Sequence, residues 1–89
     1  MKKVLYTVTR VGKENTKVSG VGCITDTDLV TAQISKNGKP YIRVYSDCLK
    51  YCHPLAGGDN EFKGAFWEIV EYEGREIELN YYIYYKIVD

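Results

Sequence analysis

The strongest constraint on the fold is a strict alternation of side chains along residues 76–88. The odd positions are all apolar or aromatic: Ile77, Leu79, Tyr81, Ile83, Tyr85 and Ile87. The even positions are more polar: Glu76, Glu78, Asn80, Tyr82, Tyr84 and Lys86. Because successive side chains of a strand point to opposite faces, the pattern predicts one long β-strand with its odd face in the core.

Period-two alternation and β-branched residues recur along the rest of the chain and predict further strands at 3–11, 17–25 and 65–72. The polar run 12–16 between the first two predicts a turn. Gly20 and Gly22 inside the second strand indicate a bulge or a close approach of backbone.

The last hairpin is predicted to turn at residues 73–75. A three-residue loop there pairs Ile69 with Leu79 and places Trp67 opposite Tyr81 on the core face. Registers shifted by one residue stay open, because loop length alone does not fix the pairing.

Residues 28–35 allow two interpretations. We expect a hairpin with a type I′ turn at Asn37-Gly38, in which Ser35 faces Pro40 and Thr31 faces Val44. Pro40 has no N–H to donate and therefore indicates a sheet edge. The alternative is an α+β fold with a helix at 27–36, N-capped by Thr25 or Thr27.

The segment 46–53 predicts one short helix, with Ser46 as its N-cap and His53-Pro54 as its stop. Residues 55–64 form the longest predicted loop. The 89 residues make one small domain, 1–89, with room for a single modest core. The predicted fold is mainly β: a small antiparallel sheet of five or six strands, curled or barrel-like.

The N-terminal residues 1–10 contain no apolar run or cleavage site typical of a signal peptide, and no stretch is long enough to span a membrane. Three cysteines are an odd number, so a complete disulfide framework is not expected in a monomer. These features favour a cytoplasmic protein with reduced thiols and no membrane partner.

Cys23, Cys48, Cys52 and His53 contain the residue types of a Cys₃His zinc site. Their spacing argues against it, because no C-x₂-C pair exists and the adjacent Cys52 and His53 point apart. We expect free cysteines that pack as small hydrophobic side chains, with no metal and no cofactor; a zinc site and a disulfide at Cys23 are the alternatives. Thiol catalysis is not expected either, since the adjacency of Cys52 and His53 is not the geometry of a catalytic dyad.

Five glutamates crowd the last hairpin: Glu68, Glu71, Glu73, Glu76 and Glu78. They alternate with apolar residues, as on a solvated strand face, so acid–base catalysis is not predicted. An acidic hairpin of this kind could instead mimic phosphates toward a basic partner. The Gly20-Val21-Gly22 and Gly57-Gly58 segments match no nucleotide-binding motif.

Nine tyrosines are the unusual feature of the composition. In the segment 41–45, Ile42 and Val44 are predicted to face the core, which leaves Tyr41, Arg43 and Tyr45 on the opposite face. The outer face of the last strand adds Tyr82, Tyr84 and Lys86. Three interpretations stay open for these six residues: internal packing, a protein-binding patch, or a surface that stacks bases while Arg43 holds phosphate.

The leading functional hypothesis is a small non-catalytic protein that binds another protein. Nine lysines against three arginines, with abundant Tyr and Ile, suit a bacterial or phage accessory or inhibitor factor. The alternative is a small barrel that binds single-stranded nucleic acid or a nucleotide-like anion. A homo-oligomer is a further possibility, through an uncovered edge strand or the Tyr82/Tyr84 face.

The zero net charge of the chain is a cancellation between its two halves. Residues 1–45 hold eight Lys and Arg and three acids, a net charge of +5, whereas residues 46–89 hold four and nine, a net charge of −5. If the halves do not interleave in the fold, the molecule is electrically two-sided and can steer a charged partner.

Overall fold

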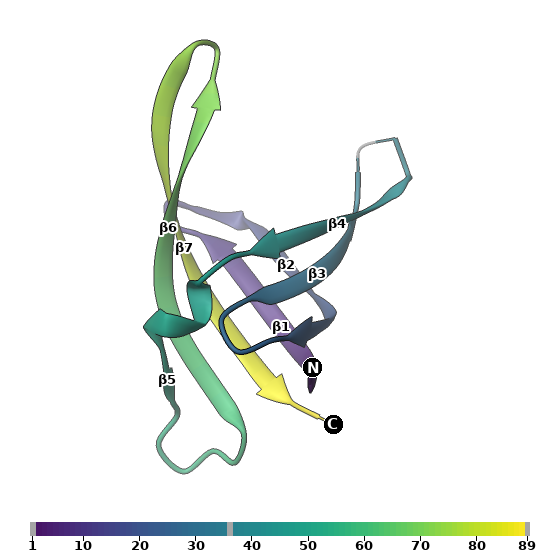
Figure 1. The fold of residues 1–89 in the computed structure, drawn as a ribbon, viewed down its shortest axis with the longest axis vertical. Coiled ribbons are helices and arrows are strands. Elements are labelled where there is room, and N and C mark those ends of the chain that lie inside the picture. The colour runs from purple at the N-terminus through teal and green to yellow at the C-terminus, as the bar shows by residue number, and fades with distance from the viewer. Residues whose placement is uncertain (1, 36, 89) are drawn as a thin grey trace.

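A single antiparallel sheet of seven strands makes up most of the molecule, in the order β4-β3-β2-β1-β7-β6-β5 (Figure 1). The computed structural model describes residues 2–35 and 37–88, with Glu14 described by its backbone alone. The elements are β1 (Lys2–Arg10), β2 (Lys13–Ile24), β3 (Leu29–Ile34), β4 (Pro40–Tyr45), the 3₁₀ turn η1 (Cys48–Tyr51), β5 (Cys52–Pro54), β6 (Glu61–Tyr72) and β7 (Arg75–Ile87). The prediction of a mainly β fold is confirmed, with seven strands instead of five or six.

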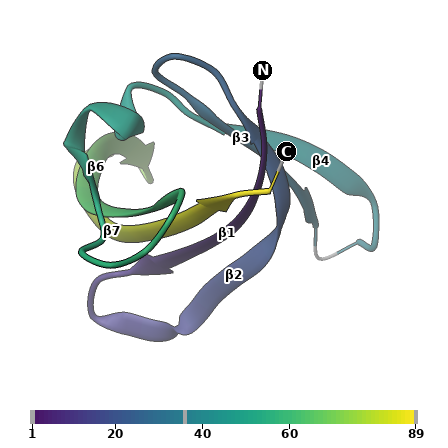
Figure 2. The ribbon, with the colours of Figure 1, turned by 90° about the horizontal axis from the view of Figure 1, so that it is seen from below.

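The sheet curls around one core without closing into a barrel, as the view along the long axis shows (Figure 2). The predicted core face of β7 is confirmed, because Tyr81, Ile83 and Tyr85 are buried. The other buried apolar residues come from the central strand β1, from strands on both sides of it and from η1: Val4, Tyr6, Val8, Ile24, Leu29, Tyr45, Cys48 and Phe66. Among the described residues, no helix is long and apolar enough to cross a membrane.

The β1–β2 hairpin turns more tightly than predicted. Strand β2 already begins at Lys13, so the turn is confined to Val11 and Gly12, whose φ is +79°. The glycine prediction is confirmed as a close approach rather than a bulge. A Cβ at Gly22 would come within 2.6 Å of a backbone oxygen and 3.2 Å of the Tyr6 ring, while the pairing there is regular.

Residues 28–35 belong to a hairpin, so the alternative helix at 27–36 is wrong for the residues the structure describes; Lys36 lies outside them. The predicted register is wrong by one residue, since Ile34 faces Pro40 and Thr31 faces Arg43. The Gly38 N–H donates to the Ser35 carbonyl at 3.0 Å, and Gly38 has a φ of +76°. This glycine ends a longer loop than the two-residue turn that was expected.

The two faces of β4 are the reverse of the prediction. Ile42 is 73% exposed and Val44 45% exposed, whereas Tyr45 is only 5% exposed. The curl of the sheet turns the face of Tyr45 toward β6, where its ring meets Phe66 edge-on with centroids 5.5 Å apart. Both faces of β4 carry apolar or aromatic side chains, so the sequence pattern alone could not show which face is buried.

The predicted helix at 46–53 is only a four-residue 3₁₀ turn, η1. Asp47, with a φ of 60°, precedes it in place of the expected Ser46 N-cap, and it makes no side-chain capping bond. The short strand β5 follows at once and ends at Pro54. The loop after it covers 55–60 rather than 55–64, because β6 starts at Glu61.

The far halves of β6 and β7 project beyond the rest of the sheet as a two-stranded arm, at the top of Figure 1. The arm turns at Glu73 and Gly74, both at positive φ, and Tyr72 pairs with Arg75. The two-residue turn shifts the predicted register by one residue. Phe66, not Trp67, therefore lies opposite Tyr81.

The strand order separates the two oppositely charged halves of the chain. Strands β1 to β4 all belong to residues 1–45 and lie on one side of the sheet, while β5 to β7 belong to residues 46–89 and lie on the other. Among the described residues, strands of the two halves pair only where β1 meets β7, so the halves do not interleave in the sheet. The side of the sheet that carries most of the positive charge is thus the β1–β4 half, and the arm belongs to the negative half.

Candidate functional site

The six residues predicted to form a binding surface lie on two opposite faces of the sheet. Tyr41, Arg43 and Tyr45 share one face of β4, because every second residue of a strand points the same way. The burial of Tyr45 shows that this is the concave inner face. The other three, Tyr82, Tyr84 and Lys86, lie on the outer face of β7, opposite the buried Tyr81 and Ile83. The structure therefore offers two separate candidate sites.

Arg43 is the centre of the inner site. Its Nη2 donates to Oε1 of Glu68 on β6, and the Tyr81 hydroxyl donates to the same oxygen at 2.8 Å. The guanidinium carbon of Arg43 also lies 4.9 Å from the centroid of the Tyr45 ring, within the range of a cation–π contact. Burial and the hydrogen bond to Glu68 raise the pKa of Tyr81 to about 12. Arg43 is thus largely committed to holding β4 against β6.

A chain of hydrogen bonds extends this network along β3 and β4. The Tyr41 hydroxyl donates to Oε1 of Gln33 at 2.8 Å, and Nε2 of Gln33 donates to the Tyr45 hydroxyl at 3.2 Å. Thr31, 1% exposed, donates to the Arg43 carbonyl at 3.3 Å. These bonds fix the rings of Tyr41 and Tyr45. The interpretation of internal packing fits Tyr45, which is buried, whereas Tyr41 is 43% exposed.

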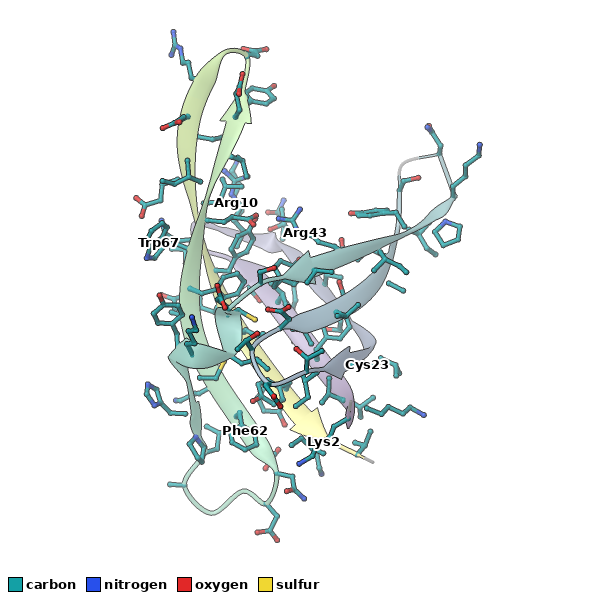
Figure 3. All side chains as sticks on the ribbon, in the orientation of Figure 1. Lys2, Arg10, Cys23, Arg43, Phe62 and Trp67 are labelled. Atoms are coloured by element: carbon teal, nitrogen blue, oxygen red, sulfur yellow. The ribbon has the colours of Figure 1, made fainter. Side chains whose placement is uncertain are left out.

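A small cavity of about 180 Å³ remains beside Arg43 on the inner face. Arg10 and Thr16 line it together with Tyr45 and Tyr81, and Arg10 and Arg43 lie near each other in Figure 3. The Nε of Arg43 is buried and has no hydrogen-bond partner among the described residues. An acceptor atom in this cavity would satisfy it.

The outer site centres on Tyr82, which is 56% exposed. Trp67, 55% exposed, lies diagonally across from it on β6, because Ala65 is the direct partner of Tyr82 and Trp67 is two residues further along. Figure 3 shows Trp67 pointing away from the body of the molecule. We call Trp67, Tyr82 and Tyr84 the aromatic face.

A groove of about 490 Å³ runs beside the aromatic face over β1, β7 and β6. Gly64 and Ala65 leave space on β6, between Tyr82 and Tyr84 on one side and Lys63 and His53 on the other. Tyr84 donates a hydrogen bond to Glu61, and this bond raises its pKa. The groove therefore combines aromatic walls with a few polar groups at its rim.

Sequence reasoning missed Trp67, Lys63 and His53 as members of this site. Trp67 was placed in the core by the register that is wrong by one residue. His53 reaches the groove only because β5 pairs with β6, where His53 lies opposite Lys63. The signal that could have placed Trp67 correctly is the Glu73-Gly74 sequence, which fits a two-residue hairpin loop. With that loop, Phe66 lies opposite Tyr81 and Trp67 falls on the outer face.

A second outer surface, also missed, covers the β2–β3–β4 end of the sheet. It consists of aliphatic side chains on three neighbouring strands, which we call the aliphatic face: Val21, Val30, Ala32, Ile34, Ile42 and Val44. The sequence pattern did not predict this face, because it placed Ile42 and Val44 in the core. Exposed aliphatic surface of this kind marks an interaction site or an aggregation hazard.

The cysteines do not assemble a metal site in the described parts of the chain, where no three His, Cys, Asp or Glu side chains are placed to hold an ion. Cys48 is buried in the core, and burial raises the pKa of its thiol to about 12 and that of Cys52 to about 11. Both thiols therefore stay protonated at neutral pH, which disfavours metal binding and nucleophilic attack. All three cysteines are free, with Cys23 on the outer side of β2.

The acidic hairpin coincides with the projecting arm, but its glutamates differ in role. Glu68 is used internally by Arg43, whereas Glu71 and Glu76 lie directly opposite each other near the tip. Like charges in this arrangement repel unless a basic group lies between them. Phosphate mimicry by the arm stays a prediction.

No protein-family model matches the chain, and neither a curated protein nor a solved structure matches it. What the two faces bind therefore has to be argued from their own residues.

Proposed function

We propose that this protein is a small non-catalytic binding domain that docks a protein partner on its aromatic face. The observation that carries the proposal is the exposure of Trp67 and Tyr82, each more than half exposed, on a rigid sheet beside a 490 Å³ groove. Trp and Tyr are the residues that most often dominate binding energy in protein interfaces. Their rings can be covered without a large loss of side-chain entropy, because both are held on paired strands.

The charge around the aromatic face favours a protein over a nucleic acid. The face lies on β6 and β7, in the half of the chain that carries a net charge of −5. Lys63 and Lys86 are its nearby cations, and Glu61 lies beside them, bonded to Tyr84. These mixed charges do not make the strongly basic surface that a phosphate backbone requires, whereas a neutral or basic protein surface needs none.

A cytoplasmic setting, as for a bacterial or phage accessory or inhibitor factor, is part of this proposal. Three free thiols agree with a reducing compartment. An exposed strand surface with no catalytic constellation among the described residues also suits a protein that acts by occupying a partner.

The proposal is tested by affinity capture from native lysate with mass spectrometry, comparing two double variants. Trp67→Ala with Tyr82→Ala removes both exposed rings of the aromatic face and should abolish recovery of the partner. Tyr51→Ala with Tyr72→Ala is the matched control, because these two tyrosines are about equally exposed but lie elsewhere. It should leave recovery unchanged. Thermal melts of both variants report whether each is folded.

Equal recovery with the folded Trp67/Tyr82 variant would contradict the proposal. So would loss of the partner with the control variant alone, because binding would then depend on η1 or the tip of the arm. A captured oligonucleotide instead of a protein would favour the alternative function, provided that its affinity falls as salt rises.

The second candidate function is the binding of a nucleotide-like anion at the inner cavity. The buried Arg43 Nε without a partner among the described residues favours it, as does Arg10 across the cavity. About 180 Å³ admits a phosphate group but not a whole nucleotide, so the base would lie outside. Calorimetric titration with inorganic phosphate and with a nucleoside monophosphate tests it. Binding that Arg10→Met does not weaken would exclude this cavity.

A further inference from the structure

The two edges of the sheet differ in how they are protected from pairing with another chain. Strand β5 is three residues long and ends at Pro54, and both features blunt an edge. Strand β4 is six residues long, and the side chains of Ile42 and Val44 on it are exposed. Its one charged residue, Arg43, is paired with Glu68 and therefore does not protect the edge from pairing with another strand. Strand β4 is therefore the vulnerable edge.

The backbone of β4 presents hydrogen-bonding groups at this edge. The Ser35 N–H donates to the Lys39 carbonyl at 2.9 Å, which makes 35 and 39 a bonded pair. Bonded and non-bonded pairs alternate along an antiparallel ladder, so Arg43 and Tyr45 bond to β3 whereas Ile42 and Val44 do not. The N–H and C=O groups of Ile42 and Val44 thus point outward. The carbonyl of Pro40 does so too.

We propose that β4 pairs with β4 of a second copy of this chain, antiparallel and about a two-fold axis at Ile42. In this register each Ile42 faces the Ile42 of the other copy and exchanges two backbone hydrogen bonds with it. The Val44 N–H of each copy donates to the Pro40 carbonyl of the other. Pro40 only accepts in this register, and because it has no N–H the Val44 carbonyl of the other copy must be solvated instead. The two sheets become one continuous sheet.

The exposed side chains agree with this register. Ile42, Val44 and Pro40 all lie on the outer face of β4, and the pairing brings the two sets together on one side of the joined sheet. The aliphatic faces of the two copies then become neighbours. A two-fold axis requires one surface to complement itself, and β4 does so with no like charges directly opposite: Arg43 faces Tyr41 of the other copy, and the two Arg43 side chains, diagonal across the axis, are each paired with their own Glu68.

Charge complementarity also favours a second copy over an unrelated strand. In the proposed register Lys39 lies opposite Tyr45 of the other copy, on the inner face where Arg43 meets Glu68. The end of β4 at Tyr45 points toward β6 and the acidic arm (Figure 1). The Lys39 end of β4 in each copy thus approaches β6 and the acidic arm of the other, while the two basic β1–β4 halves adjoin in the joined sheet. The two Lys39 residues are six strand positions apart, about 20 Å, so their repulsion is screened.

The test is sedimentation analysis of the whole chain at concentrations up to about 1 mM, the range in which small interfaces dissociate. The wild type should shift from one to two copies as its concentration rises. Val44→Pro removes an outward N–H that β3 does not use, and Ile42→Lys places two like charges at the axis. Each should weaken dimerisation at least tenfold.

Val21→Lys is the matched control, because Val21 is an exposed residue of the outer face that lies on β2, away from the edge. It should dimerise like the wild type. Loss of the dimer in this control, with Val44→Pro unaffected, would overturn the edge pairing in favour of face-to-face packing. A wild type that stays monomeric throughout would overturn the proposal outright.

Amide hydrogen exchange gives a second measurement that needs no variant. The N–H groups of Ile42 and Val44 should exchange more slowly at high than at low protein concentration, while that of Ile69 on the arm should not change. Equal exchange rates for Ile42 and Val44 at both concentrations would contradict the proposed pairing.

Discussion

Arg43 on β4 and Glu68 on β6 form an ion pair that joins two strands at opposite ends of the sheet order. Four strands, β3, β2, β1 and β7, lie between β4 and β6 in the sheet, so only the curl of the sheet brings these side chains together. Tyr81 donates to the same Glu68 oxygen at 2.8 Å and links the pair to the aromatic core. The curl and the ion pair therefore depend on each other.

The first prediction concerns this ion pair. Glu68→Gln removes the charge but keeps a group that can accept from Tyr81, and it should lower the free energy of unfolding by about 1 kcal/mol, because both side chains are about one-third exposed and partly screened. Urea denaturation measures the change. Glu71→Gln is the control, since it relieves the repulsion with Glu76 and should leave stability equal or slightly higher. Equal losses in both variants would contradict the role of the pair.

The second prediction is a loss of stability in alkaline solution. Burial raises the pKa of Tyr85 to about 12 and, together with the Glu68 hydrogen bond, that of Tyr81 to about 12, from 10 for an ordinary tyrosine. The unfolded chain therefore loses these protons first as pH rises. The stabilisation is fully present below pH 10 and should be lost between about pH 10 and 12.

Urea denaturation at a series of pH values measures this loss. Tyr85→Phe removes one of the titrating hydroxyls, so the stability of this variant should fall less steeply above pH 10. Tyr41→Phe serves as the comparison and should follow the wild type. A wild-type stability that stayed flat to pH 11 would show that these phenols titrate normally.

The third prediction concerns the thiols. Cys23 is partly exposed on β2, whereas burial raises the pKa of Cys48 to about 12 and of Cys52 to about 11. Because the thiolate is the reactive form, iodoacetamide at pH 8 should label Cys23 first and the other two only on unfolding. Peptide mass spectrometry after timed labelling measures this order. Rapid labelling of Cys48 would contradict its place in the core.

Sequence patterns were sufficient where only one face of a strand is apolar. The alternation along β7 located its buried side correctly, because Tyr81, Ile83 and Tyr85 alternate with more polar neighbours. The glycines of β2 likewise marked a close approach, since only a residue without Cβ leaves room for the Tyr6 ring. Strand type and the position of Pro40 on an edge followed from the same local chemistry.

The patterns failed where both faces of a strand are apolar or where a turn sets the register. Ile42 and Val44 were predicted to be core residues, yet in the curled sheet they are exposed and Tyr45 faces inward. The long-range pair of Arg43 and Glu68 is not encoded in any spacing along the chain. One extra or missing loop residue moved Trp67 from the core to the surface, and with it the centre of the candidate site.

The fourth prediction concerns the turn that sets this register. Glu73 and Gly74 have φ values of 51° and 73°, as a type I′ turn requires at both central positions. Gly74→Ala should lower the free energy of unfolding by about 1 kcal/mol, because a Cβ disfavours this backbone region. Glu73→Asn should raise it by a few tenths of a kcal/mol to about 1 kcal/mol, since Asn tolerates positive φ and the acidic arm loses one charge.

Thermal and urea denaturation of both variants measure these effects, with Glu71→Asn as the control for loss of charge alone. If Glu71→Asn stabilised the protein as much as Glu73→Asn, the gain would come from charge and not from the turn. The backbone effect should also appear in the arm itself. Gly74→Ala should speed amide exchange of Val70 and Ile77, which pair near the tip, while Tyr6 and Tyr85 in the body of the sheet keep their protection.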